Sequence, residues 1–377
     1  MTTTLDVDDR LLSAKEMTDV LELMFRRMEA IDSACAGDFP LYSADHGITW
    51  TASSGGSWMG GFWGACWWLR AKMTESANDQ RKAVQICQRL AAKIPADSGY
   101  RSLIFWYGAA LGEIWFRDTQ ARALTLKSIT ALAHSFNPKL NCIPLGTAMG
   151  GLAKGDQSIS IDNFAALIQL LCSSEQSLHH YMAQYHAETT LAACRRSNGA
   201  FHASAYFAER GFQADDQAGL WSRGQAWAML GLSRAAARWG EPYVSHAKAA
   251  CAYWQSSRPD DLPFNRLDRT EQFEDPSAAV IASLAMLSLA RLLPEEKTWR
   301  NHAHRQISAI IRSHYFTGFM ADSTERTQPE NASTGVFWGC CYKTKPDEEA
   351  LVESVWGNFF LMAALAALTG FIDPRHC

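Results

Sequence analysis

The chain lacks the motifs that mark metal, nucleotide and serine-hydrolase sites. It contains no His-Glu-x-x-His motif, no Cys/His spacing typical of zinc sites and no Gly-x-Ser-x-Gly nucleophile elbow. The glycines between Gly146 and Gly155 follow no apolar strand and precede no Gly-Lys-Ser/Thr, so they predict a flexible loop rather than a phosphate-binding turn. We therefore expect no metal and no cofactor.

Excess charge, paired cysteines and long apolar runs are missing as well. The net charge of −4 provides no overall attraction for nucleic acid or anionic membranes. No apolar run is long enough to span a bilayer, and Met1–Asp9 is acidic and unlike a signal peptide. The ten cysteines form no CxxC pair, which is typical of reduced thiols. These absences predict a cytoplasmic protein without nucleic-acid or membrane partners. They do not indicate which oligomeric state the protein adopts.

Helical periodicity dominates what is present, and the alternation typical of strands is almost absent. Some segments, such as Ala363–Leu368, are apolar on every side, so they are expected to be buried on both faces in two concentric layers. Twelve helices are predicted, at 13–33, 59–76, 79–94, 100–117, 119–135, 161–175, 178–194, 221–238, 243–256, 276–292, 296–313 and 350–369.

The connections between these helices alternate in length. Gaps after even-numbered helices are short, and most gaps after odd-numbered helices are long, namely 34–58, 136–160, 195–220, 257–275 and 314–349. In an up-and-down array the alternate connections emerge at the same end, so one end carries long loops of the kind that build sites. Count, burial and asymmetry together predict one all-α domain over 1–377, an (α/α)6 barrel of six helical hairpins. The sequence shows no fixed repeat period, which argues against an open solenoid.

Two aspartates stand at the entrances of predicted helices at this loop-rich end. Asp97 stands before Ser98-Gly99-Tyr100, and Asp162 stands where an apolar run begins. Each alone is most simply a helix N-cap. Together at one mouth they could share an electrostatic environment in which one carboxyl keeps a proton near neutral pH and acts as a general acid.

Other polar and aromatic residues fall in the same long loops. His202 is structural or lies at the mouth, and Arg223 needs an anion, either Asp215 or Asp216 or a ligand. Lys343 and Lys345 either bind a negative group or are solvated. The fourteen Trp residues could fill the core or stack on sugar rings.

At these residues the sequence resembles glycoside hydrolase family 88, the unsaturated glucuronyl hydrolases. The resemblance runs in blocks over most of the chain, and its most specific block is Trp-Ser-Arg-Gly-Gln-Ala-Trp at 221–227. The other blocks are Trp58–Trp63, Asp97–Tyr100, Ile159–Asp162, Asp275–Ala279 and Val355–Phe360. The resemblance implies an (α/α)6 barrel and hydration of the C4=C5 bond of a 4,5-unsaturated uronic acid at the non-reducing end of lyase-generated oligosaccharides, most simply disaccharides.

The resemblance also implies roles for individual residues. Asp162 corresponds to the general acid/base and Asp97 to the second essential carboxylate. Positions around the unsaturated sugar correspond to His202, Gln213, Arg223, Trp63 and Trp227, with Trp221 beside them, while Lys343 and Lys345 lie near positions that meet sulfate in some members. Three departures concern the leaving sugar: Gly60 and Asn358 stand where Asp is usual, and Ala96 where His is usual.

Other readings of the same residues stay open. An unsaturated rhamnogalacturonyl hydrolase shares the barrel and the reaction but acts on pectin fragments. A sugar 2-epimerase or isomerase on a similar barrel would need facing histidines, of which only His202 is a candidate. A hydrolase of saturated glycans would also use paired acids. A non-catalytic helical scaffold would not need two aspartates at the mouth of the barrel.

Overall fold

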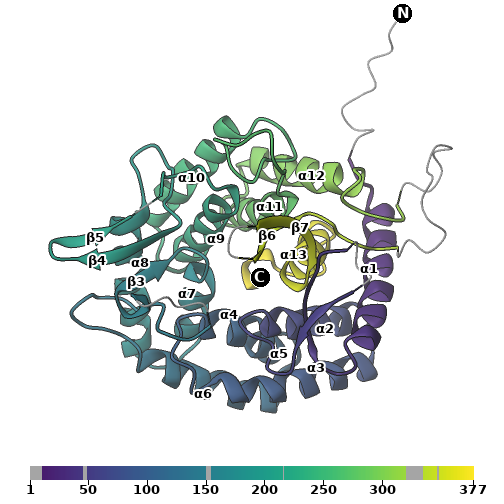
Figure 1. Cartoon of the computed structure of the whole chain (residues 1–377), viewed down its shortest axis with the longest axis horizontal. Helices are drawn as coiled ribbons and strands as arrows, with labels where there is room; N and C mark the ends of the chain where they lie inside the picture. The colour runs from purple at the N-terminus through teal and green to yellow at the C-terminus, as the bar shows by residue number, and fades with distance from the viewer. Residues whose placement is uncertain (1–10, 46–48, 150–153, 215, 320–333, 346–347) are drawn as a thin grey trace, which may run out of the picture.

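Two concentric rings of helices make up most of the structure, a computed structural model that describes residues 11–45, 49–149, 154–214, 216–319, 334–345 and 348–377 (Figure 1). The outer ring consists of α1 (Ala14–Ala34), α3 (Ala77–Arg89), α6 (Thr119–Ala133), α8 (Ser177–Cys194), α10 (Tyr243–Ser257) and α12 (Lys297–Ile311). The inner ring consists of α2 (Gly60–Thr74), α4 (Arg101–Phe105) with α5 (Leu111–Phe116), α7 (Phe164–Cys172), α9 (Ser222–Trp239), α11 (Pro276–Leu292) and α13 (Val355–Leu368). A π-helical turn, Trp106–Ala110, joins α4 to α5. The predicted (α/α)6 barrel is confirmed.

Burial explains why the helices sort into two rings. Every residue of α13 is buried, as expected for a helix that is apolar all round. In α3 the buried residues are Asp79, Ala83, Ile86 and Cys87, which share one face. The hydrophobic effect therefore draws the apolar helices inward and leaves the one-sided helices to cover them.

A buried ion pair ties the ring together where it closes. The inner helix α13 contacts both α2 and α11, and the outer helix α1 contacts α13. Nε of Arg27 on α1 donates to Oε1 of Glu353 at 3.0 Å, and its Nη2 donates to Oε2 at 2.6 Å. The amide of Asn358 donates to Oε1 of Glu353 at 3.1 Å. Asn358, one of the departures noted above, therefore supports this closing contact.

The long connections carry short strands that the sequence did not predict. In the described residues β2 (Thr51–Ser53), β1 (Phe39–Ser43), β7 (Glu348–Ser354) and β6 (Cys340–Lys345) form one sheet in that order. A second sheet contains β3 (Ser158–Ser160), β4 (Ser204–Ala208) and β5 (Gly211–Gln213). All pairings are antiparallel. Strands of three to seven residues are too short for alternation to stand out from the surrounding loop.

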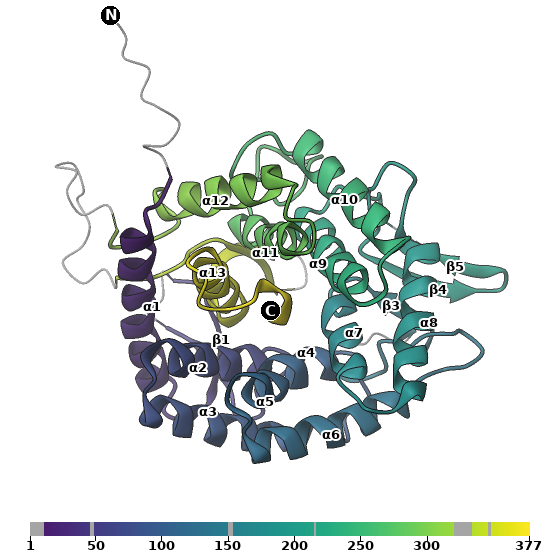
Figure 2. The same cartoon turned by 180° about the vertical axis from the view of Figure 1, so that it is seen from behind.

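The two ends of the barrel differ as the loop lengths predict. Strand-bearing connections lie at the end where the inner helices begin. At the opposite end the 3-10 turn Pro374–His376 packs against α9, α11 and α13, and Figure 2 shows it over the centre of the ring.

No described helix is long and apolar enough to cross a membrane. Met1–Asp9, Gly150, Gly151 and Asp215 lie outside the described residues.

Candidate active site

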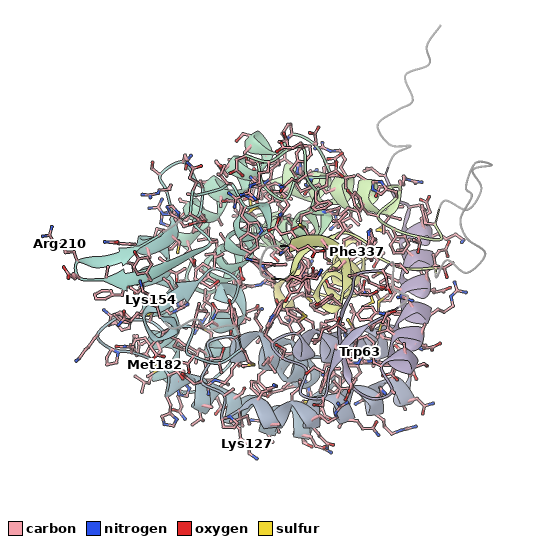
Figure 3. All side chains as sticks on the ribbon, in the orientation of Figure 1. Trp63, Lys127, Lys154, Met182, Arg210 and Phe337 are labelled. Atoms are coloured by element: carbon pink, nitrogen blue, oxygen red, sulfur yellow. The ribbon has the colours of Figure 1, made fainter. Side chains whose placement is uncertain are left out.

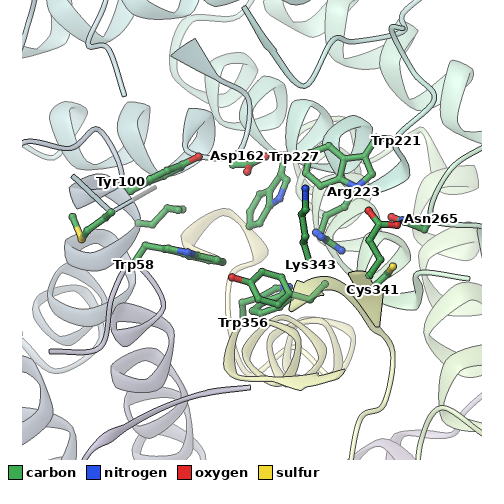
Figure 4. Close-up of a pocket in the computed structure, with 14 residues that line it drawn as sticks. Trp58, Tyr100, Asp162, Trp221, Arg223, Trp227, Asn265, Cys341, Lys343 and Trp356 are labelled. Carbon is green, nitrogen blue, oxygen red and sulfur yellow. Dashed lines mark hydrogen bonds between the residues drawn. The ribbon is translucent and has the colours of Figure 1, made fainter. Parts of the chain in front are cut away.

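A cavity of about 310 Å³ opens where the inner helices begin (Figure 4). Its walls come from the starts of α4, α7, α9 and α13 and from strands β6 and β7, so segments far apart in the sequence meet there. The lining residues are Trp58, Tyr100, Leu103, Met149, Asp162, Trp221, Arg223, Trp227, Asn265, Cys341, Tyr342, Lys343, Glu349 and Trp356.

Asp162 presents a carboxyl group with a perturbed pKa to this cavity. It lies between β3 and α7, and its backbone N–H donates to Oγ of Ser160 at 3.3 Å. The N-cap position of α7 belongs to Asn163, so Asp162 is not the capping residue. Its Oδ1 is buried and accepts no hydrogen bond from the described residues. Burial raises the pKa of Asp162 to about 6, although the charge of Arg223 acts to lower it.

Asp97 is not among the cavity's lining residues. It is exposed, and its Oδ2 accepts hydrogen bonds from the backbone N and Oγ1 of Thr147 at 3.0 and 2.8 Å. The two acidic loops still pack closely, because a Cβ on Gly99 would stand 2.9 Å from Nδ2 of Asn163. The structure does not support the expectation that Asp97 raises the pKa of Asp162, because burial raises it and Arg223 is the charge that acts on it.

Arg223 enters the cavity with its charge balanced. Its Nη1 donates to Oδ2 of Asp275, a carboxylate that is fully buried in front of α11. The other oxygen of Asp275 accepts from Oγ of Ser277 at 2.5 Å and from the backbone N of Cys341 at 3.4 Å. The same carboxylate therefore holds both the guanidinium and strand β6 in place.

The structure contradicts one of the anions expected to pair with Arg223, namely Asp216. Asp215 lies outside the described residues, and Asp216 bonds to His202 instead. Oδ1 of Asp216 lies 2.8 Å from Nδ1 of His202, and Nε of Arg196 donates to Nε2 of His202 at 2.9 Å. Both ring nitrogens of this buried histidine are thus occupied by protein groups, and His202 does not line the cavity.

Aromatic rings form much of the cavity wall. Trp221 and Trp356 flank the guanidinium of Arg223 at 5.2 and 5.9 Å from its central carbon. Trp58 packs against Trp356 with ring centroids 5.8 Å apart. Trp227, 4% exposed, completes this set. Flat apolar walls of this kind suit the faces of sugar rings.

The two lysines of β6 differ in position. Lys343 lines the cavity and pairs in register with Glu349, whose Oε2 accepts from the side-chain amide of Asn265 at 3.2 Å. Lys345 lies outside the lining and forms an exposed 2.6 Å ion pair with Glu348. Of the two lysines, the structure brings only Lys343 to the cavity.

Two further predicted residues lie outside the cavity. Trp63, on α2 (Figure 3), is 2% exposed, packs edge-on against Trp67 and does not line the cavity in which it was expected to stack on a sugar. Gln213 is exposed on β5 and pairs in register with Tyr206. Periodicity does not distinguish a core tryptophan on an all-apolar helix from a cavity tryptophan just before that helix, which here is Trp58.

The sequence reasoning missed several lining residues. Three of them, Trp58, Tyr100 and Trp356, stand inside the blocks that carry the family resemblance, so a signal existed but named no role. Asn265 and Glu349 come from loop and strand segments without any motif. In the part of the chain that the structure describes, no group of His, Cys, Asp and Glu side chains is placed to hold a metal ion.

Comparisons with known proteins agree with this geometry. No family model matches the chain. The unsaturated chondroitin disaccharide hydrolase of Streptococcus pyogenes serotype M1 is 25% identical, covering 94% of this chain and 91% of that protein. The unsaturated glucuronyl hydrolase of Bacillus sp. strain GL1 is 22% identical, covering 82% of this chain and 86% of that protein.

Solved structures extend the agreement to three dimensions. The structure of an unsaturated glucuronyl hydrolase from Bacillus sp. GL1 superposes with a TM-score of 0.77 at 18% identity, covering 96% of this chain and 98% of that chain. A mutant enzyme from Streptococcus agalactiae, complexed with dGlcA-GalNAc6S, gives a TM-score of 0.73 at 15% identity, covering 99% and 97%. The resemblance to glycoside hydrolase family 88 that the sequence motifs indicate is therefore confirmed, by similarity over nearly the whole chain and by a shared fold.

Proposed function

We propose that the protein is an unsaturated glucuronyl hydrolase, which hydrates the C4=C5 bond of a 4,5-unsaturated uronic acid at the non-reducing end of an oligosaccharide. The observation that carries the proposal is the carboxyl of Asp162, with its pKa raised to about 6, in a cavity walled by indole rings. Such a group donates a proton readily near neutral pH and, once ionised, accepts one.

Asp162 performs both proton transfers in the proposed mechanism. Its protonated carboxyl adds a proton to C4, and the positive charge that forms at C5 is shared with the ring oxygen. Water attacks C5 and gives a proton back to the carboxylate. The hemiketal then opens between C5 and the ring oxygen, and the resulting hemiacetal at C1 releases the partner sugar. The cycle returns Asp162 to its starting protonation state.

Cations in the cavity provide the binding site for the substrate's carboxylate. The charge of Arg223 is balanced by Asp275, so its remaining donors act mainly through directed hydrogen bonds. Lys343, on strand β6, adds a second positive charge at the exposed side. Trp221, Trp227 and Trp356 supply the faces on which the sugar rings stack. The volume of about 310 Å³ lies at the small end of ligand cavities, which suits a disaccharide.

A panel of lyase-generated disaccharides tests the proposal. Loss of the ultraviolet absorbance of the conjugated alkene reports hydration directly. We expect the absorbance to decay with chondroitin or hyaluronan products and to persist with the Asp162→Asn variant, which keeps the size of the side chain but has no acidic proton. Full activity of that variant would reject the role of Asp162, and decay with pectin products alone would favour a rhamnogalacturonyl hydrolase.

The competing functions lose support at the cavity. An epimerase or isomerase needs facing histidines, and no described residue lining the cavity is a histidine. The curated relatives are chondroitin disaccharide and glucuronyl hydrolases, which does not favour the pectin-directed alternative.

All ten cysteines are free, which supports the prediction of a reducing, cytoplasmic environment.

A further inference from the structure

A second polar group faces the same part of the cavity as Asp162. Tyr100 lines the cavity at the start of α4, and Figure 4 shows its ring extended toward Asp162 with the hydroxyl foremost. The two groups interact electrostatically but share no direct hydrogen bond among the described contacts. Two polar groups that face one space without touching are commonly bridged by a water molecule.

The backbone around Tyr100 fixes the position of the ring. Its N–H donates to Oγ of Ser98 at 3.1 Å, and its ring packs against Trp58 with centroids 6.4 Å apart. The adjacent Gly99 is pressed against the loop of Asn163, so no larger residue fits there. A phenol held this way loses little rotational freedom when it binds a ligand.

Ser160 lies between the phenol of Tyr100 and the backbone of Asp162. Its hydroxyl acts on the phenol of Tyr100 to lower the phenol's pKa, as a donor to the phenol oxygen would, and it also accepts the backbone N–H of Asp162 at 3.3 Å. Because Oγ already accepts that N–H, its own proton is available for the phenol oxygen. The phenol proton then remains free to point into the cavity. Burial and the charge of Asp162 raise the pKa of Tyr100, so the phenol stays protonated and serves as a donor.

We propose that Tyr100 is a catalytic residue that, together with Asp162, holds the water that attacks C5. This inference rests on the proposed function. The phenol O–H donates to the water oxygen, and the ionised carboxylate of Asp162 accepts one water proton, so that the remaining lone pair of the water points at C5. When the C5–O bond forms, that proton passes to Asp162, and Tyr100 keeps its own.

The Tyr100→Phe variant tests the proposal by removing only the hydroxyl. We expect kcat to fall about 10- to 100-fold, the effect of losing one directed hydrogen bond to a reacting group, with KM changed less than about twofold. With methanol added as a competing nucleophile, the variant should form a larger share of methyl ketal relative to hydration product than the wild type does. A merely structural role would not change this ratio.

The Tyr107→Phe variant is the matched control. Tyr107 lies on the same helical segment, and its buried hydroxyl has no hydrogen-bond partner among the described residues, so its removal should leave kcat and the product ratio unchanged. Unchanged kcat and product ratio in Tyr100→Phe, with Asp162→Asn inactive, would overturn the role of Tyr100 and leave the function intact. A wild-type protein inactive on every unsaturated disaccharide would instead remove the function itself. Circular dichroism and thermal melting verify that each variant is folded.

Discussion

Replacing Asp162 with asparagine should stabilise the protein at the same time as it abolishes turnover. Burial raises the pKa of this carboxyl from 3.8 to about 6 in the folded state. Above pH 6 the folded protein therefore holds an ionised group in an environment that disfavours its charge. Each pKa unit corresponds to about 1.4 kcal/mol, so ionised Asp162 costs about 3 kcal/mol of folding free energy.

The sign of this effect depends on pH. The unfolded chain loses the proton near pH 3.8 and the folded chain near pH 6, so stability falls as the pH rises between these values. Asparagine carries no charge and avoids that loss. The variant should gain up to about 3 kcal/mol at pH 8, and the gain should vanish near pH 4. For 377 residues the entropy of unfolding is about 0.8 kcal/mol per kelvin, so Tm should rise by about 4 °C at pH 8.

Thermal unfolding of wild type and variant, measured side by side at pH 4.5, 6 and 8, provides the test. Asp268→Asn is a suitable control because its shift has the opposite sign: a hydrogen bond from Arg266 lowers the pKa of this exposed aspartate. Its replacement should give no stabilisation at pH 8. A gain for Asp162→Asn that is equal at all three pH values, or absent at pH 8, would refute burial as the origin of the raised pKa.

Three further predictions concern the cavity. The reaction needs protonated Asp162, so kcat/KM should fall as the pH rises above about 6, and a profile that still climbs toward pH 8 would contradict the general-acid role. Asp275→Asn leaves the buried charge of Arg223 without its partner, so it should cost about 3–5 kcal/mol in chemical denaturation and raise KM; unchanged stability would show that the pair is dispensable. Lys343→Ala should raise KM for the unsaturated disaccharide, whereas Lys345→Ala, which breaks only an exposed ion pair, should not; equal effects would remove the distinction between the two lysines.

The helices were predictable from sequence because each carries its own periodic signal. The predicted segment 276–292 matches α11 exactly in its bounds, and 221–238 differs from α9 by one residue at each end. The start of α9 also explains why Trp221, Arg223 and Trp227 were found: a rigid helix presents a short motif to the cavity in one piece.

Residues that depend on contacts between distant segments were not predictable in this way. Asp275 meets Arg223 across 52 positions of the chain, and nothing in the local sequence of either residue names the other. Asp97 precedes its helix much as Asp162 does, yet its side chain turns to Thr147. The choice between Trp58 and Trp63 likewise depends on tertiary packing, because Trp58 precedes α2 and lines the cavity, whereas Trp63 lies on α2 and is buried.

The closure of the inner ring by α13 has a consequence for how activity arises during synthesis. Trp356 is the last cavity residue to leave the ribosome, and the buried contact of Arg27 with Glu353 joins the first helix to the segment just before it. A nascent chain that ends before β7 contains the carboxyl of Asp162 but lacks both Trp356, which completes the cavity wall, and Glu353, the partner of Arg27. Catalytic activity should therefore appear in one late step of synthesis. The measured activity should then be proportional to the number of chains that have completed the inner ring.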